Sequence, residues 1–355
     1  PSIAPAAARG LLFPLLSQVV KRLPPLASVV LLARLLTPLD HGLIALVLVV
    51  VGVGEIFRDF GLTPASIQAP TLEDDQRSNL FWVNLGLGVT LALVVFGLSW
   101  PVSAITQEPE MLGILQWMSL AFALNGLATQ HRASLMRALR FREIAVIDIA
   151  AAALALGVAV VWALLSPTYW ALVAQQLVTA GVTGTLAIVY ARWIPGRPNR
   201  RCDIRGLVKF GSHLVGSNLV TYVGSQVDTV LVGARFGTST LGLYNRAYQL
   251  VMTPLGQIRG PVNSVAQPVF ARVQNDTARF ERYVAAGQLA LGYGLGIPLA
   301  LVAALAYPLV ALLLGPTWLD AAPILALFAL AAFLTNLAFV GYWVYVSRGL
   351  VKNLF

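Results

Sequence analysis

The sequence predicts an all-α polytopic membrane protein, and three of its features carry that prediction. Of 355 residues, 58% are hydrophobic and only 11% are charged, which leaves too little polar surface to enclose a soluble core of this size. The mean hydropathy is +0.77. The apolar residues also fall into ten runs of roughly 20, the length at which a helix spans the hydrocarbon of a bilayer.

The ten runs are separated by connections rich in turn-forming residues. They cover residues 10–36, 42–67, 80–99, 111–136, 144–165, 169–190, 207–236, 241–270, 283–307 and 321–346. Alternate connections (TPLDHG, SWPVSAITQEPE, SPTYW, GTSTLG and GPTWLD) contain no Lys or Arg, whereas the others, with the termini, contain sixteen. The positive-inside rule therefore predicts that the arginine-rich side and both termini are cytoplasmic.

An internal repeat predicts that the chain has two related halves. LARLLTPLDHGLIA (residues 32–45) matches GARFGTSTLGLYNRA (residues 233–247) with one residue of slippage, and repeats at this separation are typical of transporters built from duplicated bundles. The predicted domains are a six-helix N-terminal lobe (residues 1–191), a cytoplasmic Pro- and Arg-rich connector (192–206) and a C-terminal lobe (207–355). The C-terminal lobe is expected to hold only four helices, fewer than a full second half needs.

Several classes of function are disfavoured by the sequence. None of the three lysines precedes Ser or Thr, so the GxxxxGK[ST] phosphate loop is absent and any pumping would be secondary. HExxH and GxSxG motifs are also absent, which disfavours an enzyme. A single cysteine, Cys202, and three scattered histidines imply no metal site or other cofactor. No signal peptide is recognisable at the start. The net charge of +9 is attributed to basic residues that set the orientation in the membrane, and it is not taken as a sign of nucleic-acid binding.

Charged residues inside the predicted spans are the candidate functional residues, because a charge at mid-bilayer costs about 2.5–3.5 kcal/mol. Counted at 1.5 Å per residue, Lys21 and Arg22 of the first span come level with Glu55 and Asp59 of the second. One interpretation is a structural salt-bridge cluster. The other is part of a cation-lined cavity for an anion, in which Glu55 or Asp59 takes a coupling proton.

Two further positions stand out in the second half. Asp228 and Arg246 are predicted at similar depth on neighbouring spans, which favours an ion pair. Arg259 lies deep in its span between Pro254 and Pro261, with no acidic partner visible in the sequence. It is the best single candidate for contact with a negatively charged substrate.

The chain also resembles a known family. The strings that carry the resemblance are LARLLTPLDHGL, FGLTPASIQ, LFWVNLGLG, SLMRALRFREIAVID, LVKFGSHLVGSNLV, VDTVLVGARFGTSTLGLYNRAYQLVMTPL and AQPVFARVQND. In this order they resemble Wzx-type polysaccharide biosynthesis flippases of the multidrug/oligosaccharidyl-lipid/polysaccharide (MOP) exporter superfamily. Of the charged residues in or next to these strings, the resemblance extends only to Arg58, Asp59, Asp228 and Arg246.

The resemblance implies a MOP-exporter-like fold of two pseudo-symmetric helical bundles around a central cavity. It implies a flippase that moves an undecaprenyl-pyrophosphate-linked oligosaccharide to the outer leaflet of the bacterial inner membrane, beside polysaccharide polymerase machinery. On this interpretation the substrate-binding cations are Lys21, Arg22, Arg58, Arg246 and Arg259, and the coupling-ion candidates are Glu55, Asp59, Asp148 and Asp228.

Three alternatives to a flippase stay open at this point. One is a cation-coupled multidrug exporter of the same superfamily, which the excess of arginine modestly disfavours. Another is a truncated paralogue that does not transport. A sugar polymerase or ligase would need a sizeable outer loop, and the predicted outer connections are short.

Overall fold

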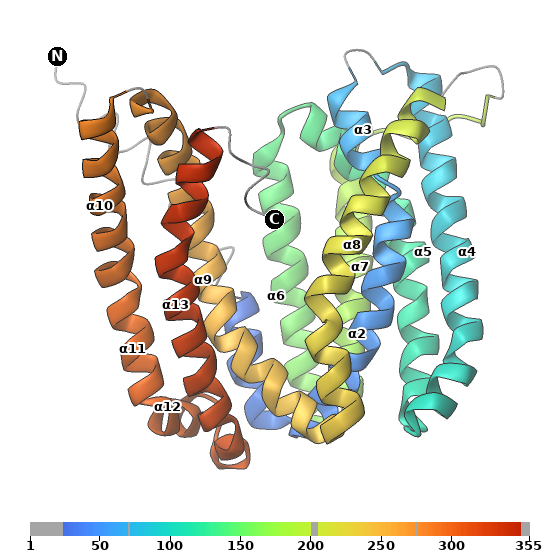
Figure 1. Cartoon of the computed structure of the whole chain (residues 1–355). Coiled ribbons are helices and arrows are strands. Elements are labelled where there is room, and N and C mark those ends of the chain that lie inside the picture. Colours follow the sequence, from blue (N-terminus) through green and yellow to red (C-terminus); the bar gives the residue numbers. More distant parts are fainter. Residues whose placement is uncertain (1–23, 70–71, 200–204, 275, 349–355) are drawn as a thin grey trace, which may run out of the picture. The chain divides into compact units, whose positions relative to one another are not determined.

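A computed structural model of the chain describes residues 24–69, 72–199, 205–274 and 276–348. In these ranges every regular element is a helix, as Figure 1 shows. Six helices within the described residues are long and apolar enough to cross a membrane. Because a bilayer offers no hydrogen-bonding solvent, a spanning chain must satisfy its backbone internally, and a helix does so within one segment. The prediction of an all-α polytopic membrane protein is confirmed.

Six of the ten predicted spans correspond to these six helices. Four of the helices are α4 (Asp74–Thr106), α5 (Glu110–Arg137), α6 (Phe141–Leu165) and α7 (Trp170–Ala191). The fifth, Thr277–Ala304, contains α10 (Thr277–Gly294) and α11 (Gly296–Ala304). The sixth, Pro316–Ser347, contains η1 (Pro316–Ala321) and α13 (Ala322–Ser347).

The other four predicted spans are helical in their described residues but are not among these six helices. The first predicted span begins outside the described residues. Its described part contains the apolar helical stretch Pro24–Leu35. The second is α2 (Pro38–Asp59) followed by α3 (Leu62–Gln68). The seventh and eighth fall in α8 (Arg205–Phe236) and α9 (Thr238–Val273), which mix Gly, Ser, Asn and Gln into their apolar residues.

Three predicted boundaries are wrong. Residues 42–67 are not one helix, because Phe60 (φ 45°) and Gly61 (φ 64°) adopt left-handed backbone conformations that end α2. Residues 283–307 are interrupted at Leu295 and again at Leu305, where α12 (Ala306–Leu313) begins. Conversely, α4 continues through Pro101 to Thr106, beyond the predicted end at residue 99, since a single proline removes only one backbone donor.

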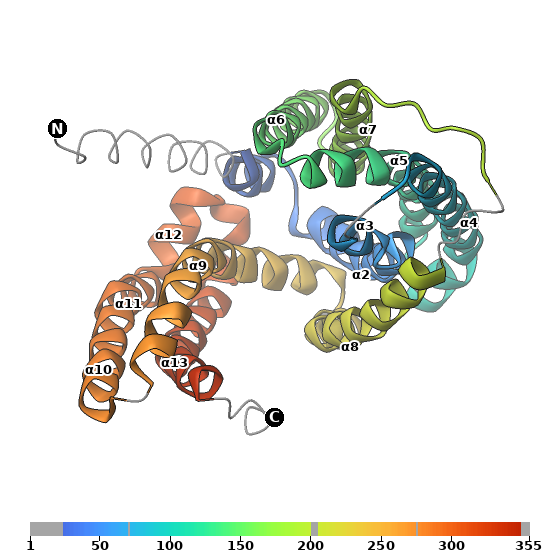
Figure 2. The ribbon, with the colours of Figure 1, turned by 90° about the horizontal axis from the view of Figure 1, so that it is seen from above.

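The chain divides into two compact units, Pro1–Leu241 and Gly242–Phe355. In the first unit α5 packs against α4 and α7, and α6 packs against α7, as seen from above in Figure 2. The contact between α4 and α5 is made by glycines: a Cβ at Gly126 would lie 2.9 Å from the Asn84 carbonyl oxygen and 3.4 Å from the Cα of Gly88. Small residues allow this close approach where the bilayer supplies no hydrophobic force between helices.

Helix α8 belongs to the first unit through its contacts with α2 and α3. The Tyr222 hydroxyl donates to the Leu48 carbonyl over 3.0 Å, and the Tyr222 ring fills the space left by Gly52. The sequence predicted a division into two lobes at residues 192–206 on the basis of the internal repeat. The compact units do not test that division, so it stays a prediction.

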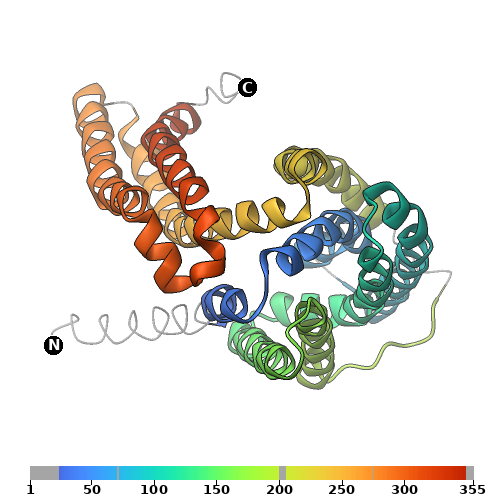
Figure 3. The ribbon, with the colours of Figure 1, turned by 90° about the horizontal axis from the view of Figure 1, so that it is seen from below.

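The second unit is held together by α13, which contacts α10, α11 and α12; Figure 3 shows these orange and red helices from below. Its core contains Phe270, Phe280 and Trp343. The Trp343 indole also donates to the Asn263 side chain over 2.9 Å. This bond satisfies a polar atom that would otherwise be buried without a partner.

Candidate functional site

The first group of predicted site residues lies between α2 and α5. The Arg58 Nε donates to a Glu55 carboxylate oxygen over 2.6 Å, and the two side chains are 13% and 30% exposed. The other Glu55 oxygen accepts from the Asn125 amide of α5 over 2.9 Å, and Arg58 also donates to the Thr129 hydroxyl. Glu55 and Arg58 therefore neutralise each other in a network that joins the two helices.

The predicted link between this group and Lys21 and Arg22 lies outside the described residues. Both interpretations of that cluster, structural and cation-lined, stay predictions. Asp59, the last residue of α2, accepts a hydrogen bond from the Thr63 hydroxyl in the first turn of α3. That contact stabilises the bend that separates α2 from α3.

Asp148 of α6, a coupling-ion candidate, forms an ion pair with Arg132 of α5 at 2.7 Å. The Arg132 and Asp148 side chains are 29% and 35% exposed. Arg132, which lies on a different helix from Asp148, was not singled out from the sequence. The Arg132 guanidinium neutralises the Asp148 carboxylate between α5 and α6.

Asp228 and Arg246 lie in different units, Asp228 on α8 and Arg246 on α9. Arg246 is only 8% exposed, and its Nη1 donates to the Gln249 side chain over 2.9 Å. Gln249 in turn donates to Asn245 over 2.7 Å. The predicted ion pair of Asp228 and Arg246 stays a prediction, and the structure adds a polar chain along α9 within the LGLYNRAYQL string.

Arg259 of α9 faces α13. Its guanidinium lies 3.4 Å from the Thr335 hydroxyl and 5.2 Å from the centre of the Phe339 ring. Its Nε is buried without a hydrogen-bond partner. Among the residues that the structure describes, no carboxylate lies within salt-bridge distance of Arg259, which agrees with the sequence-based expectation of an unpaired cation.

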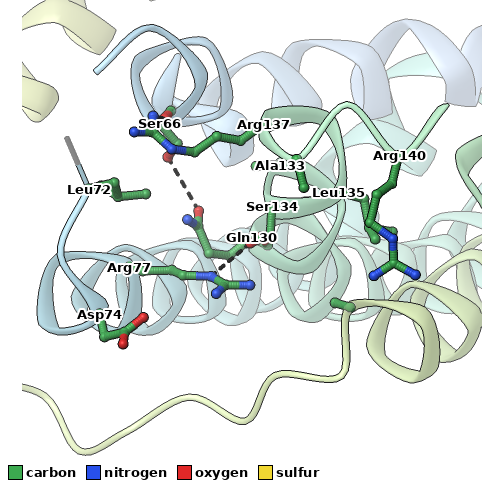
Figure 4. Close-up of a pocket in the computed structure, with 12 residues that line it drawn as sticks. Ser66, Leu72, Asp74, Arg77, Gln130, Ala133, Ser134, Leu135, Arg137 and Arg140 are labelled. Carbon is green, nitrogen blue, oxygen red and sulfur yellow. Dashed lines mark hydrogen bonds between the residues drawn. The ribbon is translucent and has the colours of Figure 1, made fainter. Parts of the chain in front are cut away.

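A second arginine-rich place, which the sequence reasoning did not single out, is a cavity of about 380 Å³ in the first unit. Figure 4 shows that it lies where α3 and α5 end and α4 begins. Its polar lining includes Arg77, Arg137, Arg140 and Gln130. In the sequence the three arginines served only as evidence for orientation, although two of them stand in the LMRALRF string.

The fold and these positions define a polytopic helical membrane protein with several arginines held between its helices. The family model described as "Polysaccharide biosynthesis protein" matches residues 31–323, and the chain belongs to this family. The resemblance stated from the sequence strings is confirmed. No solved structure gives a significant match.

Curated relatives extend this assignment. The chain is 26% identical to "Lipopolysaccharide biosynthesis protein WzxC" of Escherichia coli K12, over 72% of this chain and 52% of the relative. It is 27% identical to "Teichuronic acid biosynthesis protein TuaB" of Bacillus subtilis 168, over 79% and 58%. It is 28% identical to "Succinoglycan biosynthesis transport protein ExoT" of Rhizobium meliloti 1021, over 91% and 66%. The chain thus spans between about half and two thirds of the length of these relatives.

Proposed function

We propose that this protein is a flippase, which moves a lipid-linked oligosaccharide from the cytoplasmic to the outer leaflet of a bacterial inner membrane. The observation that carries the proposal is the family match over residues 31–323. It is supported by relatives whose names refer to polysaccharide biosynthesis and, in one case, to transport. The match favours this function over a cation-coupled drug exporter.

The proposed mechanism is secondary-active alternating access without covalent chemistry. No GxxxxGK[ST] phosphate loop occurs in the sequence. A substrate linked through pyrophosphate is anionic, and Arg259, which lacks a carboxylate partner among the described residues, has the charge and planar donor geometry to bind phosphate oxygens. The coupling-ion candidates are Glu55, Asp59, Asp148 and Asp228, of which Glu55 and Asp148 pair with arginines. The proposed neighbours in the membrane are phospholipids and polysaccharide polymerase machinery.

Deletion of the gene from its host, followed by leaflet-resolved measurement of undecaprenyl-linked intermediates, tests the proposal. We expect the intermediates to accumulate on the cytoplasmic leaflet and to be cleared when the gene is restored. Unchanged intermediates, together with a changed resistance to cationic dyes, would instead identify a drug exporter. Unchanged intermediates and unchanged resistance would indicate a paralogue that does not transport.

A further inference from the structure

The cavity shown in Figure 4 has the composition of an anion site. Three arginines and one aspartate, Asp74, are the charged residues among its lining, which leaves a net charge of +2. Its volume of about 380 Å³ lies within the range of small-ligand pockets. By the distribution of Lys and Arg, it opens on the side predicted to be cytoplasmic.

Each arginine is positioned by contacts to the protein. Arg77 of α4 donates from Nε to the Ser134 hydroxyl over 2.8 Å, and its guanidinium carbon lies 4.0 Å from the centre of the Trp193 ring. Arg137 donates to the carbonyls of Ser66 and Ala69 over 2.8 and 2.6 Å. These contacts fix the side chains before any ligand arrives, which reduces the entropy lost on binding.

Arg140 completes the set from the turn between α5 and α6. Its Nε pairs with Glu143 at 3.0 Å, and its Nη1 donates to the Tyr190 carbonyl at the end of α7 over 2.9 Å. A guanidinium has five donors. The bond to Ser134 uses one donor of Arg77, and the bonds to Glu143 and Tyr190 use two of Arg140, so the lining is richer in donors than in acceptors.

Gln130 provides an independent sign of a missing acceptor. Its side chain is 0% exposed, its Oε1 lies 3.4 Å from the Ser66 hydroxyl, and its Nε2 has no hydrogen-bond partner. The amide lies between Ser66 and the Arg77 guanidinium, at the wall of the cavity (Figure 4). A buried donor without a partner costs about 1–3 kcal/mol, so a ligand that supplies an oxygen there is favoured.

From this lining we infer a binding site for a phosphate or diphosphate group between the ends of α3 and α5 and the start of α4. Phosphate oxygens are acceptors only, and arginine binds them with paired donors. Two sources share this chemistry, an anionic lipid headgroup and the diphosphate of a lipid-linked sugar. The site is separate from the Arg259 position, and it does not depend on the proposed transport function.

Direct binding to the purified full chain tests the site, with inorganic pyrophosphate as the probe. We expect Gln130→Glu, which replaces the donor by a negative charge, and Arg77→Gln each to weaken pyrophosphate binding about tenfold or more, the equivalent of one charge-assisted hydrogen bond. Arg142→Gln removes an exposed charge next to the α5–α6 turn, outside the lining, and should change binding less than about twofold. Should Arg77→Gln fail to fold, Gln130→Leu removes the donor without adding charge.

A second arm distinguishes the two sources. Wild-type protein and Arg77→Gln are melted in nanodiscs of phosphatidylglycerol or phosphatidylcholine, without pyrophosphate. If the wild type melts at a higher temperature in phosphatidylglycerol than in phosphatidylcholine and Arg77→Gln does not, the natural ligand is a lipid headgroup. If the wild type binds pyrophosphate but shows no such difference between the lipids, the natural ligand is the diphosphate of a lipid-linked sugar. The site is refuted if the wild type binds neither probe, or if Gln130→Glu and Arg77→Gln bind as the wild type does. Because flipping is not the readout, these results do not depend on the test of the proposed function.

Discussion

Glu55 of α2 and Asn125 of α5 are joined by a hydrogen bond of 2.9 Å, although they are far apart in the sequence. The opposite carboxylate oxygen of Glu55 pairs with Arg58 at 2.6 Å. Glu55→Ala should therefore leave the largely buried Arg58 guanidinium without its counter-charge. We expect a loss of unfolding free energy of about 3 kcal/mol, the lower end for a broken buried pair because Glu55 is partly exposed.

The double variant Glu55→Leu with Arg58→Met provides the control for this prediction. Replacing both partners by apolar residues avoids an unpaired charge, so part of the lost stability should return. Thermal or denaturant unfolding in detergent measures both variants. A double variant no more stable than Glu55→Ala would show that the ion pair is not what stabilises this contact.

The contact between α4 and α5 predicts a sharp difference between two neighbouring glycines. An added Cβ at Gly88 would lie 2.6 Å from the Phe122 carbonyl oxygen, whereas one at Gly86 meets nothing within 4 Å. Gly88→Ala should destabilise the protein by about 1–3 kcal/mol through overpacking. Gly86→Ala should be neutral or stabilising by up to about 1 kcal/mol, because alanine favours the helix. Equal melting temperatures for the two variants would contradict this packing.

Arg259 is expected to contact the anionic part of the substrate. Arg259→Ala should lower flipping about tenfold or more, since a charge-assisted hydrogen bond is worth about 1.5–3 kcal/mol, and Arg259→Lys should lower it less. The measurement is clearance of lipid-linked intermediates at matched protein levels. The exposed Arg272 lies on the same helix, and Arg272→Ala should flip normally. Full activity of folded Arg259→Ala would remove this residue from the substrate path.

The connector after α7 offers a test of orientation. The Asn199 backbone N–H donates to the Asn79 side chain over 2.8 Å, and that side chain donates back to the Asn199 carbonyl over 2.7 Å. Residue 199 is thus fixed near the start of α4. Cys202, outside the described residues, follows three positions later and should share that side of the membrane.

A membrane-impermeant maleimide should label Cys202 only after cells are permeabilised, because this side carries the excess of arginine. Cys202 is the single cysteine of the sequence, so Cys202→Ser gives the background. Labelling of intact cells to the same extent as permeabilised cells would invert the predicted orientation, and with it the predicted direction of flipping.

Local sequence predicted some boundaries and charges well and others poorly. Apolar runs located α5 and α13 to within a few residues, because long apolar helices satisfy their own backbone. The break at Gly61 was missed although Gly61, with Pro64 three residues later, is a local signal for the end of a helix. What the sequence does not show is the packing at this break: a Cβ at Gly211 of α8 would lie 2.1 Å from the Phe60 carbonyl oxygen.

The sequence by itself determined that this is a helical membrane protein of the polysaccharide biosynthesis family, since hydropathy and family strings are properties of the chain in order. Only the tertiary structure decided which charges are neutralised and which are not. Arg132 and Asp148 lie on separate helices yet form an ion pair, whereas Arg259 faces Thr335 and Phe339. The same holds for Arg77 and Gln130, which approach the same cavity from separate helices. Electrostatic partners depend on distances of a few ångströms between side chains, and those distances exist only once the helices have packed.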